Sequence, residues 1–534
     1  MKAMTCAEGV MRLLAAYGVD TVFGMAGTMT VELYRGISLA GIRHVQCRNE
    51  QGASLMADGY ARATGRPGVC TIIAGPGVTN AATGIAQAYC DSKPLLVLSG
   101  ASATRTHGKG WGEIHELDDQ AAVTAGFTAF SAMIRYPEEV PELLARAYSI
   151  FRGSRPRPVH LSLPRDVLPL AIDTAWRPRR TPSLPMPDPA AIEEAAERLA
   201  RAERPLILVG GGAVGTGSAL VEIAERLGAP VLATNAGKGI LPQSHPLSLG
   251  CSIVQEASQQ ALSESDVVLI VGSEVSAGDH FQTRLDITSE IIRIDIDPLE
   301  LTSQYAPALA IQADARAAML ALSSALSERA TPAQRSRGET RTQAILARNA
   351  ASMTDIQKMH ARVWRIVRAA LPAEAIVMGD ASQIVYTGSF AMPMEIEGCW
   401  HYSGTYCSLG VALPMAVGAK IGAPDRPVIA VAGDGGVLFT LNELATAAEE
   451  RLALPVLVWN NDALKEIVDQ MDRRDIPRIG VEPKSPDFVG VAQSLGCHAT
   501  RAENADHLGR CIQDALRADR PTLIEVRQDS AWLA

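Results

Sequence analysis

Short apolar runs alternate with longer amphipathic stretches along most of the chain. The runs VCTIIA at 69–74, LILV at 206–209 and VVLIV at 267–271 are almost wholly apolar. They have the length of strands, and continuous apolar strands are typical of parallel sheets covered on both faces. The stretch 79–88 that follows the first run has helical spacing. This alternation predicts an α/β fold of doubly wound parallel sheets.

Two breaks in composition divide this pattern. The segment 177–189 (RPRRTPSLPMPDP) is rich in Pro and Arg, which predicts an extended linker. The segment 323–353 is polar and predicts a helical or loose connection. We therefore expect three α/β domains, over residues 1–176, 190–325 and 354–534, each of ordinary domain size.

Composition and charge narrow the class of protein. The chain has 534 residues, a net charge of −9 and 4% aromatic residues. These values argue against a nucleic acid or an anionic membrane as partner. The nine cysteines are scattered and form no CxxC pair, which favours free thiols in a cytoplasmic protein. No apolar run of about 18 residues predicts a membrane helix.

The clearest chemical motif follows two predicted strands in the last third of the chain. The strand at 428–432 ends in a glycine-rich cluster, and the strand at 456–459 ends in Asn460 and Asn461. A helix is expected between them. The predicted helix face consists of Leu438, Leu441, Leu444, Ala445 and Ala448. Because the carboxyl ends of parallel strands meet at one edge of a sheet, we expect both clusters to border one ligand site.

The residue types of this motif suit a metal and a diphosphate. The glycine-rich cluster consists of Gly433, Asp434, Gly435 and Gly436. Glycines let backbone N–H groups approach a phosphate closely. The side chains of Asp434 and Asn461 offer the hard oxygen ligands that Mg²⁺ prefers. A metal between them would bridge two phosphate oxygens.

This arrangement resembles the thiamine-diphosphate family of acetolactate synthases, pyruvate decarboxylases and benzoylformate decarboxylases, over nearly the whole chain. The resemblance implies an enzyme that acts on 2-oxo acids with thiamine diphosphate and Mg²⁺. The first and third domains would bind the thiamine diphosphate. Asp434, the Asn461 side chain and the carbonyl of Ala463, where the family usually has Gly, would bind the metal.

A second family signature lies at 48–53 (RNEQGA), after the predicted strand 44–47. The resemblance implies that Glu50 hydrogen-bonds the pyrimidine N1′ of the cofactor and helps to activate it. In this family the pyrimidine sits on one subunit and the diphosphate on its partner. Glu50 and Asp434 of one site would then come from different chains of a homodimer or homotetramer.

The segment 403–416 (SGTYCSLGVALPMA) resembles the part of the family that supports the cofactor from below. By this resemblance, Leu409 is the apolar wedge that keeps the cofactor bent. The carbonyl of Cys407 would accept a hydrogen bond from the pyrimidine amino group, at a position that is usually Gly.

Two further segments resemble loops of the family, GDASQ at 379–383 and FGMAGT at 23–28. The first implies that Ser382 and Gln383 reach the diphosphate. The second implies that Thr28 lines the substrate pocket.

The choice of reaction depends on a loop in the first domain. Ile73 and Ala74 occupy the strand end where some decarboxylases of the family have a catalytic His. The segment HELDDQ at 115–120 resembles 5-guanidino-2-oxopentanoate decarboxylases. This resemblance implies decarboxylation, with His115 as proton donor and with His115 and Glu116 in contact with substrate. The loop carries four carboxylates and no Lys or Arg: Glu113, Glu116, Asp118 and Asp119. One of them could pair with a guanidinium.

Other functions stay open on the sequence alone. An acetolactate synthase-like carboligase shares most of these motifs. The run GGGAVG at 210–215 matches GxGxxG after a strand, which leaves a nicotinamide or flavin oxidoreductase as a remote alternative. We interpret these glycines as a structural turn and expect no FAD, because 274–279 lacks the flavin run of acetolactate synthases. Intact Glu50, Asp434 and Asn461 argue against a non-catalytic relative.

Overall fold

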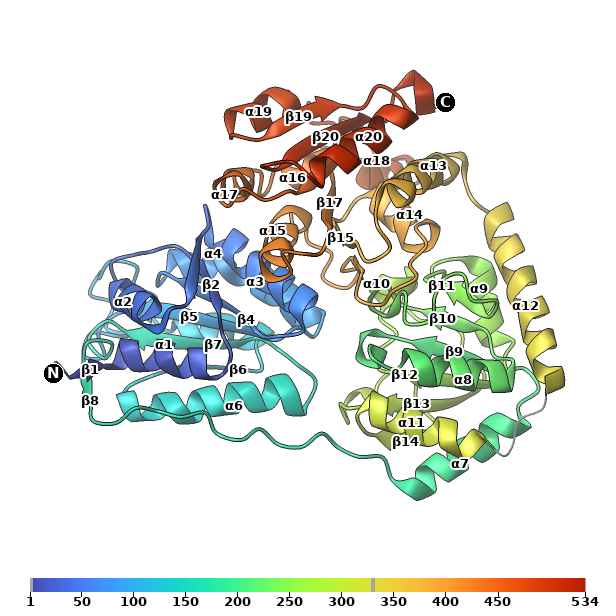
Figure 1. Cartoon of the computed structure of the whole chain (residues 1–534), viewed down its shortest axis with the longest axis horizontal. Coiled ribbons are helices and arrows are strands. Elements are labelled where there is room, and N and C mark those ends of the chain that lie inside the picture. Colours follow the sequence, from blue (N-terminus) through green and yellow to red (C-terminus); the bar gives the residue numbers. More distant parts are fainter. Residues whose placement is uncertain (1–2, 328–331, 534) are drawn as a thin grey trace. The chain divides into compact units, whose positions relative to one another are not determined.

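The computed structural model describes residues 3–327 and 332–533. It forms two compact units, and the chain passes between them several times (Figure 1). The first unit comprises Met1–Ser183, Ser408–Arg501 and Asp514–Val526. The second unit comprises Leu184–Cys407, Ala502–Gln513 and Arg527–Ala534.

The first domain contains six parallel strands in the order β3-β2-β4-β5-β7-β6. Its strands are β2 (Thr21–Gly24), β3 (Arg43–Gln46), β4 (Gly68–Ile72), β5 (Leu95–Ala101), β6 (Phe130–Met133) and β7 (Val159–Pro164). Its helices are α1 (Cys6–Ala16), α2 (Val31–Ala40), α3 (Glu50–Thr64), α4 (Pro76–Cys90), α5 (Gln120–Thr124) and α6 (Val140–Gly153). A small antiparallel pair joins β1 (Met4–Thr5) to β8 (Ala171–Ile172).

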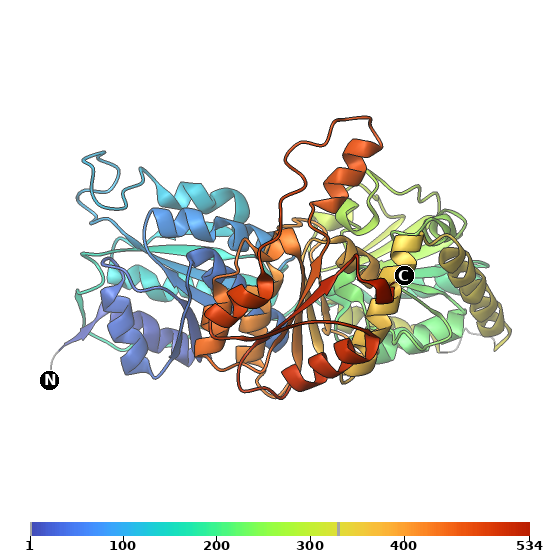
Figure 2. The same ribbon diagram turned by 90° about the horizontal axis from the view of Figure 1, so that it is seen from above.

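Alternate side chains of this sheet pack against different helices. Val69, Leu96 and Leu98 join the apolar cluster formed with α1, α2 and α6. Cys70 and Val97 point to the opposite face, where α3 and α4 lie (Figure 1). Both faces are therefore covered, as continuous apolar strands require. Figure 2 shows the same layers from above.

The second unit contains another sheet of six parallel strands, in the order β11-β10-β9-β12-β13-β14. Its strands are β9 (Leu206–Val209), β10 (Val231–Ala233), β11 (Ser248–Gly250), β12 (Val267–Val271), β13 (Glu290–Asp295) and β14 (Leu309–Gln312). Its helices are α7 (Pro189–Arg201), α8 (Gly217–Leu227), α9 (Glu256–Ser263), α10 (Ala277–His280), α11 (Ala315–Leu326) and α12 (Pro332–Ala351). No helix or strand interrupts the predicted linker between β8 and α7, all of which is described.

The last domain also has parallel strands with helices around them. In the first unit the strand order is β17-β18-β20-β19. These strands are β17 (Val428–Gly433), β18 (Pro455–Asn460), β19 (His498–Arg501) and β20 (Thr522–Arg527). The helices of the last domain in this unit are α15 (Ala412–Gly422), α16 (Asp434–Val437), α17 (Glu443–Glu449), α18 (Lys465–Asp472) and α19 (Phe488–Ser494). Most of α20 (Ala505–Ala515) belongs to the second unit. In the second unit β15 (Ile376–Gly379) pairs in parallel with β16 (Trp400–His401), beside α13 (Asp355–Ala370) and α14 (Gln383–Ala391).

The predicted fold class is confirmed, with a parallel sheet and flanking helices in each domain. One predicted element is wrong. The single helix expected after the glycine-rich cluster is two short helices, α16 and α17, and Leu438 is exposed rather than buried. Between the two helices the backbone makes three-residue turns, in which the N–H groups of Phe439 and Thr440 donate to the carbonyl groups three residues earlier at 3.1 and 3.3 Å. The Thr440 hydroxyl donates to the Gly410 carbonyl at 2.7 Å and holds this segment. The buried side of α17 is accordingly Glu443, Leu444, Thr446 and Ala447.

Helices α3 and α15 pack with almost no side chains between them. A Cβ atom on Gly418 would overlap the carbonyl oxygen of Met56, and one on Gly59 would overlap that of Met415. The start of α3 is set by Asn49, whose side chain accepts from the N–H of Gln51 at 2.8 Å. The position of α3, and of the residue with which it begins, therefore depends on this close approach.

Gly418→Ala should destabilise the first unit, because the new Cβ would force the two helices apart. Overpacking of this kind costs about 1–3 kcal/mol or more, which corresponds to several degrees of Tm. Differential scanning calorimetry would measure the shift. Gly126→Ala is the matched control, since a Cβ there meets no atom within 4 Å. Equal shifts for the two variants would contradict the close-packing argument.

Candidate functional site

Glu50 is the first residue of α3, directly after the loop that follows β3. Its side chain is buried, and its Oε2 accepts a hydrogen bond from Asn80 Nδ2 at 3.0 Å. A carboxylate in the first turn of a helix is favoured by the helix dipole. Asn80, on α4, was not singled out by the sequence analysis, although it orients the carboxylate of the predicted catalytic residue.

The turn after β4 lies against the acidic loop, and the start of α4, which follows at once, lies against Glu50. A Cβ on Gly77 would lie 3.2 Å from Glu50 Oε1, and a Cβ on Gly75 would lie 2.5 Å from the carbonyl oxygen of His115. Gly75 has a φ of +59°, which a side chain would strain further. The backbone at His115 thus lies against the same short turn as the Glu50 carboxylate.

His115 adopts a left-handed backbone conformation, with a φ of 61°. Such a conformation costs about 1–3 kcal/mol for a residue other than Gly, and strain of this kind concentrates at functional sites. The His115 side chain is half-buried. These features agree with a functional role, and its role as proton donor stays a prediction.

The four carboxylates of the loop have different partners. Glu116 accepts from the N–H groups of Gly110, Gly112 and Glu113 at 2.9, 2.7 and 3.0 Å. Desolvation of the Glu116 carboxylate tends to raise its pKa. The hydrogen bonds from these N–H groups outweigh that effect and lower the pKa of Glu116 below its usual value. The predicted substrate ligand Glu116 is therefore also the residue that closes the loop on itself.

The other three carboxylates divide between structural contacts and solvent. Glu113 forms an ion pair with Arg165 at 3.0 Å. Asp119 caps α5 by accepting from the N–H groups of residues 121 and 122. Asp118 is exposed, and among the described residues its carboxylate has no hydrogen bond or ion pair. Asp118 is thus the carboxylate most available for a ligand.

Gln120 anchors the end of this loop in the sheet. Its Nε2 donates to Ser99 Oγ at 2.9 Å, to the Gly100 carbonyl at 2.7 Å and to Ser162 Oγ at 2.9 Å. Its Oε1 accepts from the N–H of Gly75 at 3.4 Å. One buried amide therefore links the loop, two strands and the turn beside Glu50. In the sequence, Gln120 is marked only as the last residue of the segment HELDDQ.

The metal-type oxygens lie together at the ends of β17 and β18, which are parallel neighbours. Asp434 Oδ2 accepts from the N–H of Asn461 at 3.2 Å and lies 3.1 Å from Ser485 Oγ. Desolvation raises the pKa of Asp434, and its hydrogen bonds oppose the shift. Asn461 is held through its N–H, while its side-chain Oδ1 is buried with no hydrogen-bond donor among the described residues.

This oxygen set fits a small hard cation. A carboxylate, an amide oxygen and a nearby backbone carbonyl are ordinary Mg²⁺ ligands. Asp462, which has a φ of 53°, carries the chain from Asn461 to Ala463. In contrast, Asn460 is structural, because its Nδ2 donates to Glu525 Oε1 at 2.7 Å. Ser485 comes from a loop without any recognisable motif and was missed by the sequence analysis.

The remaining predicted contacts lie on loops and helix starts. Leu409 is half-buried in the first unit, and Thr28 is exposed on the loop after β2. Ser382 and Gln383 begin α14 in the second unit, as suits a residue pair near an anion. Cys407 has a φ of 54°, a left-handed backbone conformation that Gly adopts more easily than other residues. The cofactor contacts of these residues stay predictions.

The glycine run after β9 has a packing role. A Cβ on Gly210 would lie 2.6 Å from Ser273 Cβ, and a Cβ on Gly212 would lie 2.9 Å from Gly272 Cα. Asp279, in the stretch compared with the flavin run, accepts from Asn235 and from Ser276 Oγ. These residues bind their own chain, which supports the interpretation of the run as a structural turn.

Comparison with known proteins agrees with the geometry. Residues 4–123, 192–322 and 380–526 match the models for the N-terminal TPP binding domain, the central domain and the C-terminal TPP binding domain of thiamine pyrophosphate enzymes. A probable 2-ketoarginine decarboxylase of Pseudomonas aeruginosa is 45% identical, over 99% of this chain and 95% of that protein.

Acetolactate synthases are more distant relatives. A probable acetolactate synthase large subunit of Methanocaldococcus jannaschii is 31% identical over 99% of this chain and 92% of its own length. The large subunit of acetolactate synthase isozyme 1 of Escherichia coli is 29% identical over 99% of this chain and 95% of its own length. With all three domain models matched in order, this chain belongs to the family of thiamine pyrophosphate enzymes.

Proposed function

We propose that this enzyme decarboxylates a 2-oxo acid with a cationic tail, and that 5-guanidino-2-oxopentanoate, also called 2-ketoarginine, is its preferred substrate. The observation that carries the proposal is the contact of the acidic loop with the turn beside Glu50. An unpaired carboxylate on that loop could bind a guanidinium while the 2-oxo acid group reaches the cofactor. The 45% identical relative supports the same substrate.

The chain's own residues would divide the work as follows. Thiamine diphosphate, when bound, supplies a carbon nucleophile for the 2-oxo group and a cationic ring that takes up the electron pair released as CO₂ leaves. Glu50, oriented by Asn80, would hold a proton at the pyrimidine. Asp434 and Asn461 would hold Mg²⁺ on the diphosphate. His115 would return a proton to the substrate carbon that lost CO₂.

A carboligase of the acetolactate synthase type is the second candidate, because relatives of that name match nearly the whole chain. The two functions differ in what the substrate-derived carbon meets next: a proton from the enzyme, or a second 2-oxo acid. Product analysis on a panel of 2-oxo acids separates them. We expect no bound FAD in either case.

Location and assembly complete the proposal. All nine cysteines have free thiols, which agrees with a reducing cytoplasm. Among the described residues, no helix is long and apolar enough to cross a membrane. We propose a homodimer or homotetramer in which each site takes Glu50 from one subunit and Asp434 from its partner.

Chelation should abolish activity, and Mg²⁺ with thiamine diphosphate should restore it. Asp434→Ala should lose cofactor retention, because the diphosphate charge would lack its metal bridge. Equilibrium dialysis with radiolabelled thiamine diphosphate would measure retention. Full activity of exhaustively stripped apoprotein would contradict the metal and cofactor assignment.

Glu50→Gln should fold and bind cofactor weakly, yet lose most turnover. The amide cannot hold a proton at the pyrimidine as the carboxyl group does. Hydrogen-deuterium exchange at the thiazolium C2 of the cofactor, followed by NMR, should slow by orders of magnitude. An unchanged exchange rate would remove Glu50 from this role, whatever the effect on turnover.

Mixing two inactive variants tests the shared site. Glu50→Gln and Asp434→Ala chains, co-expressed in equal amounts, should recover about a quarter of wild-type activity, because a mixed dimer rebuilds one intact site. Each variant alone should stay inactive. If the mixture is as inactive as its components, both residues of a site come from one chain and the assembly proposal fails.

Asp118→Asn should raise KM for 5-guanidino-2-oxopentanoate by about tenfold or more, the scale of a lost charge-assisted pair. Steady-state kinetics with pyruvate, which has no cation, should change little. Asp119→Asn is the matched control: it removes the same charge from the same loop, and Asn can still cap α5. Equal KM changes for the two variants would indicate that the total negative charge of the loop attracts the substrate, and would contradict a specific ion pair between Asp118 and the guanidinium. A wild-type preference for pyruvate or benzoylformate would refute the substrate proposal and leave the cofactor assignment intact.

A further inference from the structure

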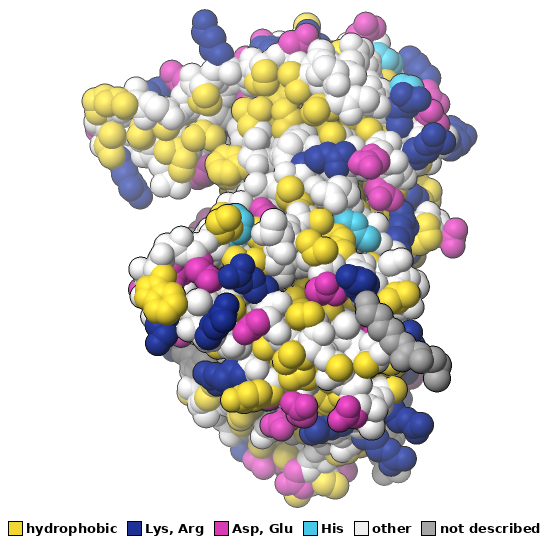
Figure 3. Space-filling model, turned by 90° about the vertical axis from the view of Figure 1, so that its left-hand side faces the viewer, with side chains coloured by type: hydrophobic (Ala, Val, Ile, Leu, Met, Phe, Trp, Pro, Cys, Tyr) yellow, Lys and Arg dark blue, Asp and Glu magenta, His cyan; other side chains and the backbone are white. Residues whose placement is uncertain are grey.

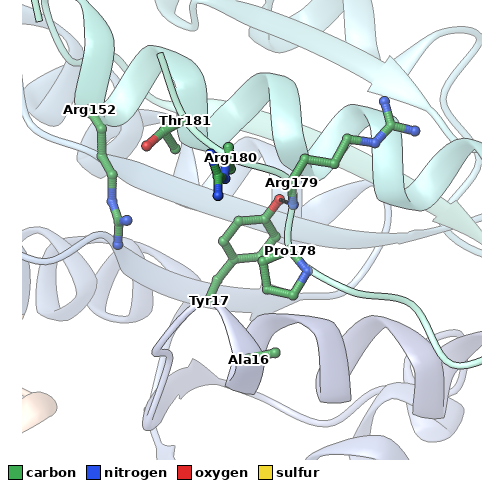
Figure 4. Close-up of a pocket in the computed structure, with 7 residues that line it drawn as sticks. All are labelled: Ala16, Tyr17, Arg152, Pro178, Arg179, Arg180 and Thr181. Carbon is green, nitrogen blue, oxygen red and sulfur yellow. Dashed lines mark hydrogen bonds between the residues drawn. The ribbon is translucent and has the colours of Figure 1, made fainter. Parts of the chain in front are cut away.

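We propose that the first unit carries a second ligand site, a cationic pocket for a small oxyanion with two or more negative charges. The pocket has a volume of about 310 Å³ and lies where the end of α1, the end of α6 and the start of the linker meet (Figure 4). The residues that define it are Tyr17, Arg152, Pro178, Arg179, Arg180 and Thr181. None of them belongs to the candidate site described above.

The floor of this pocket is a stacked aromatic pair. The Tyr17 ring stacks on the Tyr148 ring, with centroids 3.9 Å apart and planes 12° from parallel. The Tyr17 hydroxyl accepts from the backbone N–H of Arg179 at 3.0 Å. The hydrogen bond holds the linker on a buried aromatic pair, although no helix or strand fixes the linker there. The pocket is therefore set by packing in the first unit.

The charge of the pocket is uncompensated. Among the described residues, no carboxylate lies within ion-pair distance of the Arg152, Arg179 or Arg180 guanidinium groups. A guanidinium cannot shed its proton to relieve repulsion from its neighbours. Elsewhere in the same unit, buried Arg62 is neutralised by Asp58 and Asp91 at 2.8 and 2.7 Å. The face drawn in Figure 3 likewise mixes acidic and basic side chains.

The arrangement of donors favours an oxyanion. In Figure 4 the side chains of Arg152, Arg180 and Thr181 lie on the same side of the Tyr17 ring, whereas the guanidinium of Arg179 extends away from it. Two guanidinium groups and a hydroxyl can each donate to oxygens of one anion. The Arg152 guanidinium also lies 5.8 Å from the Tyr148 ring centroid, which limits its freedom.

The size of the pocket limits the ligand. Small-molecule sites have volumes of about 300–1,000 Å³, so this pocket is at the lower end of the range. It suits a phosphate-bearing or dicarboxylate metabolite better than a large cofactor. Phosphates and dicarboxylates share the chemistry that the arginines recognise, and the arms of the experiment below distinguish them.

Isothermal titration calorimetry tests the site on the full-length enzyme, loaded with thiamine diphosphate and Mg²⁺ so that the diphosphate site is filled. Inorganic phosphate and malonate are titrated separately at constant ionic strength, set with NaCl. We expect saturable binding of at least one of them. Preference for phosphate would assign a phosphate-bearing ligand, and preference for malonate a dicarboxylate. No saturable binding of either would overturn the proposal.

Variants separate a built site from general surface charge. Arg152→Gln and Arg180→Gln should each weaken binding by about tenfold or more, the scale of a lost charge-assisted pair. Arg179→Gln removes the same charge from a guanidinium that points away, and should weaken binding less than threefold, roughly the scale of an exposed charge. Equal losses for all three variants would overturn the proposal.

A conservative variant guards against a folding artefact. Arg180→Lys keeps the charge but loses the planar fork, and should bind with intermediate affinity. Arg180 is exposed on the linker, so its variants should keep the wild-type Tm in the absence of ligand. If Arg180→Gln melts as the wild type does and binds the anion equally well, the proposed contact does not exist.

Discussion

The contact of α3 with α15 is the constraint on which the candidate site depends. Small residues let the two helix backbones touch at Gly59 and Gly418, so the helices cannot slide past each other without steric overlap. Glu50 begins one of these helices, and the Leu409 segment leads into the other. One packing contact thus fixes both the helix that Glu50 begins and the helix that follows Leu409. A buried ion pair between Arg62 and Asp58, one turn apart on α3, also stabilises this helix.

The metal site follows from the topology of the sheet in the same way. Parallel pairing of β17 with β18 brings both strand ends to one edge, so Asp434 meets the N–H of Asn461 without any long-range coincidence. Burying a carboxylate at this edge is costly, and hydrogen bonds from neighbouring N–H and hydroxyl groups offset only part of the cost. A divalent cation would offset the rest. The site is therefore better suited to the metal-bound state than to the free protein.

The parts of the site that the sequence predicted are those carried by strand ends. Asp434 directly follows the apolar strand β17, and Glu50 begins the helix that comes after β3 and a short loop, so their placement needs only strand-helix alternation and the parallel rule. Ser485, Asn80 and Gln120 reach the site from loops or helices far along the chain, where no periodicity marks them. Their contacts depend on tertiary packing, which local patterns do not encode.

The broken helix after the glycine-rich cluster has the same explanation. Leu438 and Leu441 have helical spacing with Leu444, and a helix of that register would bury all three. In the structure the segment between the two helices instead makes three-residue turns, and the Thr440 hydroxyl bonds the Gly410 carbonyl. That contact joins residues thirty positions apart, so the apolar pattern alone does not reveal it and predicts the wrong face.

The acidic loop shows why charge counts are poor guides to specificity. Four carboxylates look equivalent in the sequence, yet one caps a helix, one pairs with an arginine and one binds three backbone N–H groups. Three of the four carboxylates therefore stabilise the conformation of the loop. Asp118 can bind a ligand selectively, because the other three already have hydrogen-bond or ion-pair partners. The same loop is tied through Gln120 to the turn beside Glu50. A substrate that orders this loop would therefore be coupled, through the buried Gln120 amide, to the turn beside Glu50, the residue predicted to activate the cofactor.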